Sequence, residues 1–220
     1  MATEIELKAH MSKTHASQEV ESLRSILSEK ADYKFAFEKE DTYFFPSGAS
    51  ESFPSGLRLR SERRTLPDGT EEFETLLTHK RKKVRDGVEQ NDEKEFEIRP
   101  SSCRTALNQA AVNQTAAEFR ELLEALGLRP LTSKRKQGWA FSRNGIIAEL
   151  LEVTTLGWFL ELEIIAADSH ENNGQGTGID PEQSYAEGRQ RLLDFLDSTG
   201  LARETIESRF YSEMLKDNIS

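Results

Sequence analysis

Charged residues recur at every second position in six short segments of the chain. The first, Glu4-Ile5-Glu6-Leu7-Lys8, alternates charged and apolar residues. In an extended strand, residues i, i+2 and i+4 lie on one face, so Glu4, Glu6 and Lys8 share a face and the apolar residues share the other. The other segments carry same-face charges of like sign: Arg58 and Arg60; Lys80 and Lys82; Glu93, Glu95 and Glu97; Lys134 and Lys136; and Glu161 and Glu163.

Acidic and basic segments alternate along the chain, which indicates that they face a common interior. Like charges two residues apart repel each other unless opposite charge or water lies between them. In a shared interior the carboxylates can bind divalent cations, and the Lys and Arg side chains can bind an anion. Carboxylate and polyphosphate oxygens are the ligands that Mg²⁺ and Mn²⁺ prefer. The alternative, a solvated sheet laced by salt bridges, predicts acid and base mixed within each strand.

The elements between and around these charges predict a closed barrel. We predict strands at 33–37, 42–45, 57–60, 73–82, 93–99, 134–141, 146–153 and 160–165. We predict helices at 17–30, with Ser17 as N-cap, and at 116–126, 181–196 and 203–215. If the charges face inward, the apolar faces lie outside under amphipathic helices, and closure removes exposed strand edges. We expect an α+β fold in which one domain over 1–220 forms a closed β-barrel, with helices in 181–215 packed on it.

Length and composition limit the class of protein. The 220 residues suffice for one substantial domain, and a net charge of −10 argues against a nucleic-acid polymer as partner. The single cysteine, Cys103, excludes an intramolecular disulfide and a cysteine zinc cluster, and it favours a cytoplasmic location. The first residues do not resemble a signal peptide, and glutamates interrupt the most apolar region, 145–167, so we expect neither export nor membrane insertion.

Several motifs resemble the CYTH superfamily, the triphosphate tunnel metalloenzymes. The opening EIELK is similar to the ExExK signature of that superfamily. Six further motifs follow in its order and spacing: DTYF (41–44), LRLR (57–60), LLTHK (76–80), EKEFEI (93–98), SKRK (133–136) and LGWFLELE (156–163). The superfamily includes class IV adenylate cyclases, thiamine triphosphatases and inorganic triphosphatases. The resemblance implies an eight-stranded antiparallel tunnel.

The resemblance also implies roles for the same-face charges. It implies binding of Mg²⁺ or Mn²⁺ by Glu4, Glu6, Glu95, Glu97 and one or both of Glu161 and Glu163, and Glu93 is a further candidate in the same run. It implies triphosphate binding by Lys8, Arg58, Arg60, Lys80, Lys134 and Lys136. Two positions depart from the family pattern: Asn91 replaces a frequent arginine, and Leu151 replaces a frequent acid, for which Glu149 and Glu152 are the candidate substitutes.

Lys8, His10 and Tyr43 are the candidate catalytic residues. His10 shares the parity of Glu4 and Glu6, although a surface or hydrogen-bonded role is the alternative. Tyr43 could orient a nucleophile or stack on a base, and packing is its alternative role. A metal that bridges phosphate oxygens lowers the pKa of a bound water or hydroxyl, so a histidine base is not required.

Two reactions and one role without catalysis fit these residues. Attack of the ribose 3′-hydroxyl on the α-phosphorus of ATP gives cyclic AMP and pyrophosphate, whereas attack of water on the terminal phosphorus hydrolyses tripolyphosphate or thiamine triphosphate. The stretch 20–45 and LGWFLELE are most similar to the cyclase-like branch, so adenylate cyclase activity is the prediction. A polyphosphate or nucleotide sensor, or a scaffold, is the alternative, but a pure anion binder has no need of the acidic set. A homodimer is also compatible with the sequence.

Overall fold

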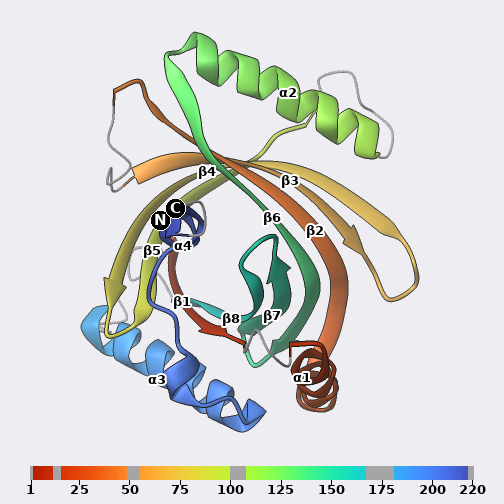
Figure 1. Ribbon diagram of the computed structural model, residues 1–220, viewed down its shortest axis with the longest axis vertical. Coiled ribbons are helices and arrows are strands. Elements are labelled where there is room, and N and C mark those ends of the chain that lie inside the picture. Colours follow the sequence, from red (N-terminus) through yellow and green to blue (C-terminus); the bar gives the residue numbers. More distant parts are fainter. Residues whose placement is uncertain (1, 12–15, 49–54, 100–107, 167–180, 218–220) are drawn as a thin grey trace, which may run out of the picture.

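Eight strands form a closed antiparallel barrel (Figure 1). The computed structural model of the protein describes residues 2–11, 16–48, 55–99, 108–166 and 181–217; Cys103 and the side chains of Lys80 and Lys82 lie outside this description. The strand order around the barrel is β1-β5-β4-β3-β2-β6-β7-β8. The strands are β1 (Ala2–His10), β2 (Asp32–Pro46), β3 (Ser55–Thr65), β4 (Glu71–Arg85), β5 (Val88–Glu97), β6 (Leu128–Arg143), β7 (Ile146–Val153) and β8 (Gly157–Ala166). The predicted α+β fold and eight-stranded barrel are confirmed.

The largest apolar core lies outside the barrel wall, between β1, β7 and β8 and the helices α1 (Ala16–Lys30) and α3 (Pro181–Thr199). Ile5 and Leu7 of β1 are completely buried there, together with Leu27 of α1 and Leu192 of α3. Helix α2 (Gln109–Ala125) covers the opposite side of the barrel, over β2, β3 and β4 (Figure 1). The apolar parity of the first strand therefore faces the helices, as predicted. None of the helices in the described ranges is long and apolar enough to cross a membrane.

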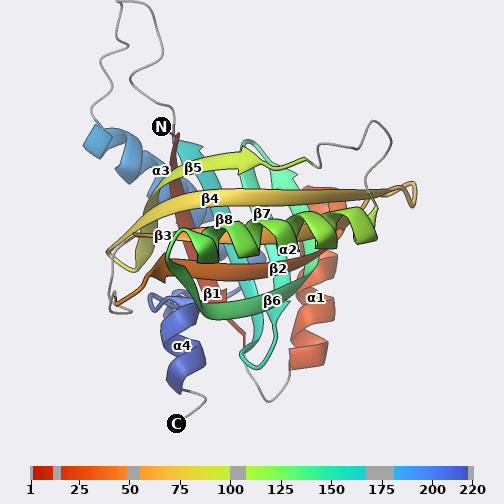
Figure 2. The same ribbon diagram turned by 90° about the horizontal axis from the view of Figure 1, so that it is seen from above.

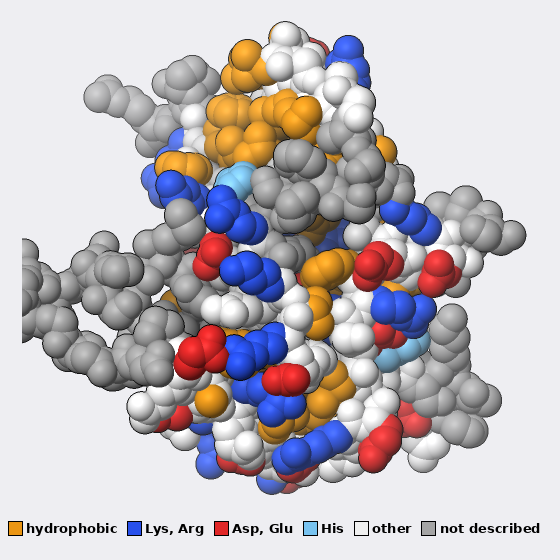
Figure 3. All heavy atoms as spheres, turned by 90° about the vertical axis from the view of Figure 1, so that its left-hand side faces the viewer, with side chains coloured by type: hydrophobic (Ala, Val, Ile, Leu, Met, Phe, Trp, Pro, Cys, Tyr) orange, Lys and Arg blue, Asp and Glu red, His pale blue; other side chains and the backbone are white. Residues whose placement is uncertain are grey.

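The outer surface that the helices leave uncovered is charged. The second half of β4 exposes Arg81, Lys83 and Arg85 outward, and Figure 3 shows acidic and basic side chains mixed over this face. These residues alternate with inward positions on the same strand, because successive side chains of a strand point to opposite faces. These charged side chains therefore lie on the solvated exterior, apart from the charged side chains inside the barrel.

Two predicted strands, 33–37 and 42–45, form the single strand β2. Its pairing with β3 continues without interruption through Glu38, Lys39 and Glu40. The outward carboxylates in this stretch bind basic residues of the neighbouring strands: Glu38 pairs with Arg63, and Glu40 Oε2 lies 3.1 Å from Arg135 Nη2. The charged run that suggested a break is thus compatible with a strand because its charges are matched across the sheet.

The predicted helix at 203–215 is wrong as a continuous helix. A short 3₁₀ turn, η1 (Arg203–Thr205), is followed by extended chain and then by helix α4 (Tyr211–Asp217). In the extended part, Ile206 pairs with Ala9 and the backbone N–H of Glu207 donates to the carbonyl of Lys8 at 2.8 Å. These hydrogen bonds to the end of β1 take the place of the intrahelical ones. As a result, α4 lies at one end of the barrel (Figures 1 and 2).

Part of the inner wall is apolar, which corrects the expectation of a wholly polar bore. Strand register places Phe37, Gly138, Leu151 and Phe159 side by side in one row across β2, β6, β7 and β8. The three large side chains of this row are buried and belong to one apolar cluster. Tyr211 of α4 packs on the same cluster. This part of the interior is therefore filled, and the charged residues lie at other positions of these strands and on β1, β3 and β5.

Replacing Gly138 by alanine is expected to destabilise the barrel, because β7 passes too close for a side chain. A Cβ atom added at Gly138 would lie 2.1 Å from the carbonyl oxygen of Leu150 and 2.7 Å from the Cα atom of Leu151. Backbone shifts forced by overpacking cost about 1–3 kcal/mol. Urea unfolding should show a free energy of unfolding lower by that amount, whereas Gln137→Ala, at the exposed neighbouring position, should change it little. Equal stability of Gly138→Ala and wild type would contradict the close approach.

Candidate active site

Carboxylates line the inner wall on three adjacent strands, β5, β1 and β8. Register places Glu6 directly across from Glu89 on one side and from Glu163 on the other. Directly opposed residues of neighbouring strands share a face, and like charges in such pairs are destabilising. Glu4, two residues from Glu6, is buried and accepts a hydrogen bond of 3.1 Å from Nδ2 of Asn91. We call Glu4, Glu6, Glu89 and Glu163, together with Glu161 of β8, the acidic wall.

Two buried lysines pair with the acidic wall. Lys8 forms a buried ion pair with Glu89. Lys136 Nζ lies 2.8 and 2.6 Å from the two carboxylate oxygens of Glu161. Burial alone would raise the pKa of Glu161, but the Lys136 ammonium group holds that pKa below its usual value. Burial alone would likewise lower the pKa of Lys136, but Glu161 and then Glu6 raise it. Both members of the Lys136–Glu161 pair are therefore charged at neutral pH.

Asp41 of β2 lies at the centre of a group of cations. It is completely buried, and its two oxygens accept from Nε and Nη2 of Arg60 at 2.6 and 3.0 Å. Lys134 Nζ lies 3.7 Å from Asp41 Oδ2. Burial alone would raise the pKa of Asp41, but the Arg60 guanidinium group, with help from Arg58 and Lys134, holds this pKa well below its usual range. The carboxylate keeps these cations in place without neutralising all of them.

Arg58 completes the basic part of the interior. Its Nη2 donates to Thr78 Oγ1 at 2.9 Å and to Glu95 Oε2 at 3.3 Å, and the Arg58 residue is itself buried. We call the inward cations Lys8, Arg58, Arg60, Lys134 and Lys136 the basic cluster. Its guanidinium and ammonium groups suit phosphate oxygens, since they carry several N–H donors and a fixed charge. The basic cluster and the acidic wall thus face one interior.

The structure brings together most, but not all, of the predicted site residues. Glu93 pairs with Ala2 of β1 in the register, and Glu95 is held by Arg58 and Thr78. Glu97 lies at the end of β5, beyond the residues that pair with β1, and its carboxylate accepts from Arg99 at 2.7 and 2.9 Å. It is not brought to the acidic wall. The backbone of Lys80 pairs with Glu93 and Gly56, which places this residue on an inward position of β4.

The candidate catalytic residues occupy different surroundings. Tyr43 lies opposite Arg58 in the register, and Lys134 Nζ is 5.2 Å from the centroid of its ring, so Tyr43 borders the basic cluster. His10 stacks on Phe159 with ring centroids 4.5 Å apart. Its Nε2 is buried and makes no hydrogen bond among the residues that the structure describes. His10 therefore belongs to the apolar row rather than to the charged interior.

Sequence reasoning missed several inward charges. Glu89 continues the parity of Glu93 and Asn91 back toward the Asp86-Gly87 turn, where Asp86 and Gly87 have positive φ (51° and 77°), so extending the alternation to this turn would have found Glu89. On β3, Glu62 shares the inner face with Arg60 and accepts from Arg64 Nε at 2.6 Å. On β2, Lys39 and Asp41 also share this face. Acid and base are therefore mixed on some strands, which corrects the prediction of complete segregation.

Tyr211 of helix α4 lies at one end of the charged interior. Tyr211 is 5% exposed and packs edge-on against Phe159 with ring centroids 5.0 Å apart. The Nζ atoms of Lys134 and Lys136 each lie 4.8 Å from the centroid of its ring. Burial, followed by the Glu161 carboxylate, raises the pKa of Tyr211 well above its usual value, so its hydroxyl is neutral. No periodicity around Tyr211 pointed to this position.

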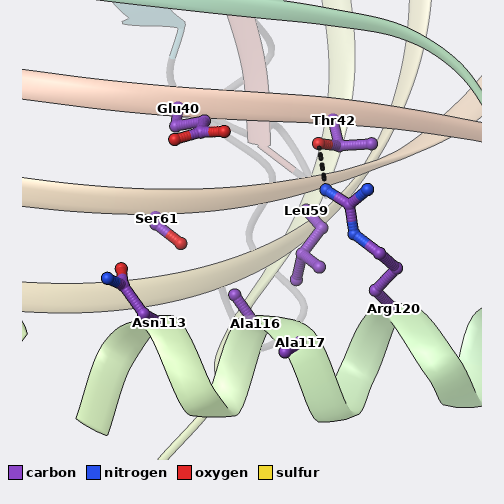
Figure 4. A pocket seen from close by; sticks show the side chains of 8 residues that line it. All are labelled: Glu40, Thr42, Leu59, Ser61, Asn113, Ala116, Ala117 and Arg120. Atoms are coloured by element: carbon purple, nitrogen blue, oxygen red, sulfur yellow. Dashed lines mark hydrogen bonds between the residues drawn. The ribbon is translucent and has the colours of Figure 1, made fainter. Parts of the chain in front are cut away.

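A groove outside the barrel is separate from this interior. It has a volume of about 230 Å³ and lies between α2 and the outer faces of β2 and β3 (Figure 4). Thr42 and Leu59 form part of its floor, and Arg120 Nη2 of α2 donates to Thr42 Oγ1 at 3.1 Å. Because Thr42 and Leu59 alternate with the inward residues of their strands, the groove lies behind the basic cluster and does not open into it.

The family model for the CYTH domain matches residues 2–211. The chain belongs to the CYTH family. The resemblance predicted from the sequence motifs is thereby confirmed over nearly the whole chain.

Solved structures share this fold over nearly their full lengths. The PH1819 protein from Pyrococcus horikoshii OT3 is 22% identical, with 97% of this chain and 98% of that one covered and a TM-score of 0.70. A candidate adenylate cyclase from Vibrio parahaemolyticus is 16% identical (97% and 97% covered, TM-score 0.64). A candidate adenylyl cyclase from Hippeastrum, reported to have a dominant triphosphatase activity, is 20% identical (98% and 94% covered, TM-score 0.54). No match was found among curated proteins.

The structure shows how this chain accommodates its two departures from the CYTH pattern. Leu151 is completely buried in the apolar row. Glu149 faces inward, and its Oε1 lies 2.5 Å from Lys39 Nζ, whereas Glu152 faces outward and accepts from Gln137 Nε2 at 2.9 Å. Of the two candidate substitutes, Glu149 alone shares the inner face. Asn91 takes the inward position across from Glu4 and donates to it.

The acidic wall fits a divalent cation by its chemistry and its position. Its five carboxylates lie on adjacent strands, and oxygen donors of this kind suit Mg²⁺ and Mn²⁺. Among the residues that the structure describes, no three acidic, cysteine or histidine side chains are already close enough together to hold a metal ion. Glu89 and Glu161 instead bind Lys8 and Lys136. Rotation of these side chains is therefore required before the acidic wall can enclose an ion.

Proposed function

We propose that the protein is a divalent-metal-dependent enzyme that acts on a triphosphate-containing substrate inside its barrel. The observation that carries this proposal is the row of opposed carboxylates, Glu89, Glu6 and Glu163, which shares the barrel interior with the basic cluster. Opposed like charges cost stability, and a divalent cation offsets that cost. A structure that only bound an anion would gain nothing from this arrangement.

The proposed metal ligands are Glu4, Glu6 and Glu163, joined by Glu161 and Glu89 when their lysines are released. Bound Mg²⁺ or Mn²⁺ would neutralise phosphate charge and lower the pKa of a bound water or hydroxyl. Lys8 and Lys136 can transfer their hydrogen bonds from Glu89 and Glu161 to phosphate oxygens. That exchange adds free carboxylates to the acidic wall. Triphosphate and metal should therefore each increase the affinity for the other, because such coupling is reciprocal.

Arg58, Arg60 and Lys134 would hold the remaining phosphate oxygens, and Tyr43 borders the same space. In the expected reaction, the ribose 3′-oxygen of ATP forms a bond to the α-phosphorus. The bond from that phosphorus to the α–β bridging oxygen breaks, pyrophosphate leaves with this oxygen, and the hydroxyl proton passes to solvent water. The Vibrio parahaemolyticus candidate cyclase shares this fold. Hydrolysis of a triphosphate is the second candidate, because the Hippeastrum protein of the same fold has a dominant triphosphatase activity.

Analysis of the reaction products distinguishes adenylate cyclase activity from triphosphate hydrolysis. The purified protein should be incubated separately with ATP, tripolyphosphate and thiamine triphosphate, each with Mg²⁺, with Mn²⁺ or with excess chelator, and the products separated by chromatography. We expect cyclic AMP and pyrophosphate from ATP, and no product with chelator. Orthophosphate as the main product would instead establish hydrolysis. Binding of these compounds without any product would overturn the proposed enzyme in favour of a sensor.

A further inference from the structure

Two isoleucines interrupt the charged inner face next to the acidic wall. Ile165 of β8 lies directly across from Glu4, and Ile147 of β7 lies directly across from Glu163. Because opposed residues share a face, both isoleucines lie on the inner side of the wall. They are diagonal neighbours, since Ile165 follows Glu163 by two residues on the same strand.

Unlike the apolar residues of the row through Leu151, these two side chains remain open to solvent. Ile147 is 38% exposed and Ile165 is 56% exposed, whereas Leu151 and Phe159 are completely buried. Their position explains the difference, because α4 covers the apolar row at the other end of the barrel, where Tyr211 packs on Phe159. Ile147 and Ile165 therefore lie toward the end of the interior opposite to Tyr211.

The geometry restricts where a substrate larger than its phosphates can extend. Phosphates held by Lys8, Lys134 and Lys136 lie beside Tyr211, whose ring approaches all three ammonium groups. A group attached to the phosphate chain meets the Tyr211 ring on that side, whereas the opposite direction leads past the acidic wall. Ile147 and Ile165 present exposed apolar surface on this path, and Val84 of β4, 41% exposed and directly across from Glu89, lies on the other side of the acidic wall. Burial of this exposed apolar surface against a ring would be favourable.

We propose that Ile147 and Ile165 form a contact site for the organic group of the substrate, which is therefore an organic triphosphate that carries an aromatic ring rather than inorganic tripolyphosphate. This inference rests on the proposed function. Inorganic tripolyphosphate has no group that reaches these side chains. Other exposed apolar residues, such as Leu122 and Leu126 at the end of α2, lie outside the barrel and have no such relation to the basic cluster.

A double variant, Ile147→Ser with Ile165→Ser, tests the site by comparing substrates. Steady-state kinetics should be measured with ATP, thiamine triphosphate and tripolyphosphate at saturating metal. We expect KM for the preferred organic triphosphate to rise about tenfold, as is usual for the loss of apolar contact in a binding pocket, with KM for tripolyphosphate unchanged. Val at both positions should retain most of the affinity, and Leu126→Ser, an exposed apolar change outside the barrel, should have no effect.

The outcomes separate this inference from the proposed function. If wild type is active and the double variant has unchanged KM values, or KM values raised equally for all substrates, the contact site is refuted while the proposed enzymatic function is retained. Activity of wild type on tripolyphosphate alone also refutes it. If wild type turns over no substrate, the proposed function fails. Equilibrium binding of ATP and of tripolyphosphate then tests the contact site: the double variant must bind ATP more weakly than wild type and tripolyphosphate equally well. If wild type binds neither ATP nor tripolyphosphate, both the contact site and the proposed function are refuted.

Discussion

Replacing Glu6 by glutamine is expected to lower metal-dependent turnover by about 100-fold or more, because the central carboxylate of the acidic wall becomes a neutral amide. The fold should persist, since Glu6 lies between Glu89 and Glu163 and the change removes repulsion between opposed like charges. Initial rates with Mg²⁺ or Mn²⁺ should therefore collapse while the thermal midpoint without metal stays near that of wild type. A variant that lost activity because it misfolds would instead show a lower rate together with a lower thermal midpoint.

The thermal midpoint also reports metal binding directly. A ligand that binds only the folded state raises the midpoint, so Mn²⁺ should raise that of wild type and much less that of Glu6→Gln. Glu152→Gln is the matched control, because Glu152 lies on the outer face of β7 and bonds to Gln137. This control should retain both turnover and the shift by Mn²⁺. Wild-type turnover in Glu6→Gln would remove Glu6 from the proposed metal site.

The alternation of charged and apolar residues predicted the barrel well because strand periodicity depends on local chain geometry. Glu4, Glu6 and Lys8 lie inward and Ile5 and Leu7 lie outward, as their parity required. The alternation along one strand does not, however, determine which residues of the neighbouring strands lie opposite each other. That Glu6 lies between Glu89 and Glu163 depends on pairing between strands more than 80 residues apart in the sequence, and the motif resemblance alone suggested that these strands meet.

Other features could not be predicted from the sequence because they depend on tertiary contacts. The apolar row at Leu151 and Phe159 has the same alternation as an outward face, and only closure of the barrel places it inside. Tyr211 enters the interior because Ile206 and Glu207 bond to β1 rather than continue a helix. Glu97 shows the same dependence on register: its parity is inward, but it lies beyond the residues of β5 that pair with β1, and it bonds to Arg99.

Asp41 illustrates why a buried carboxylate in a basic site has to be judged from its partners. It lies among the cations of the basic cluster, where it accepts two hydrogen bonds from Arg60 and leaves Arg58 bonded to Thr78 and Glu95. A buried ion pair contributes little net stability, but loss of one partner leaves an uncompensated charge. The pair therefore fixes the orientation of Arg60 more than it stabilises the fold.

Replacing Arg60 by methionine is accordingly expected to destabilise the protein by about 3 kcal/mol, because Asp41 would remain buried without its bidentate partner. Lys134, 3.7 Å from Asp41, compensates part of the charge and keeps the effect at the lower end of the range for broken buried pairs. The double variant Asp41→Asn with Arg60→Met removes both charges and should recover much of the lost stability. Urea unfolding at pH 7 measures the difference.

The pH dependence of the Arg60→Met effect identifies Asp41 as its cause. In wild type the folded pKa of Asp41 is depressed, so its stabilisation is present above the unfolded pKa of about 3.9 and is lost as the pH falls through the folded value. Without Arg60, burial raises that pKa, and protonation relieves the uncompensated charge. The stability deficit of Arg60→Met should therefore be largest at neutral pH and shrink toward pH 4. A deficit that is independent of pH, or a double variant no more stable than the single one, would show that Arg60 acts through its packing and not through Asp41.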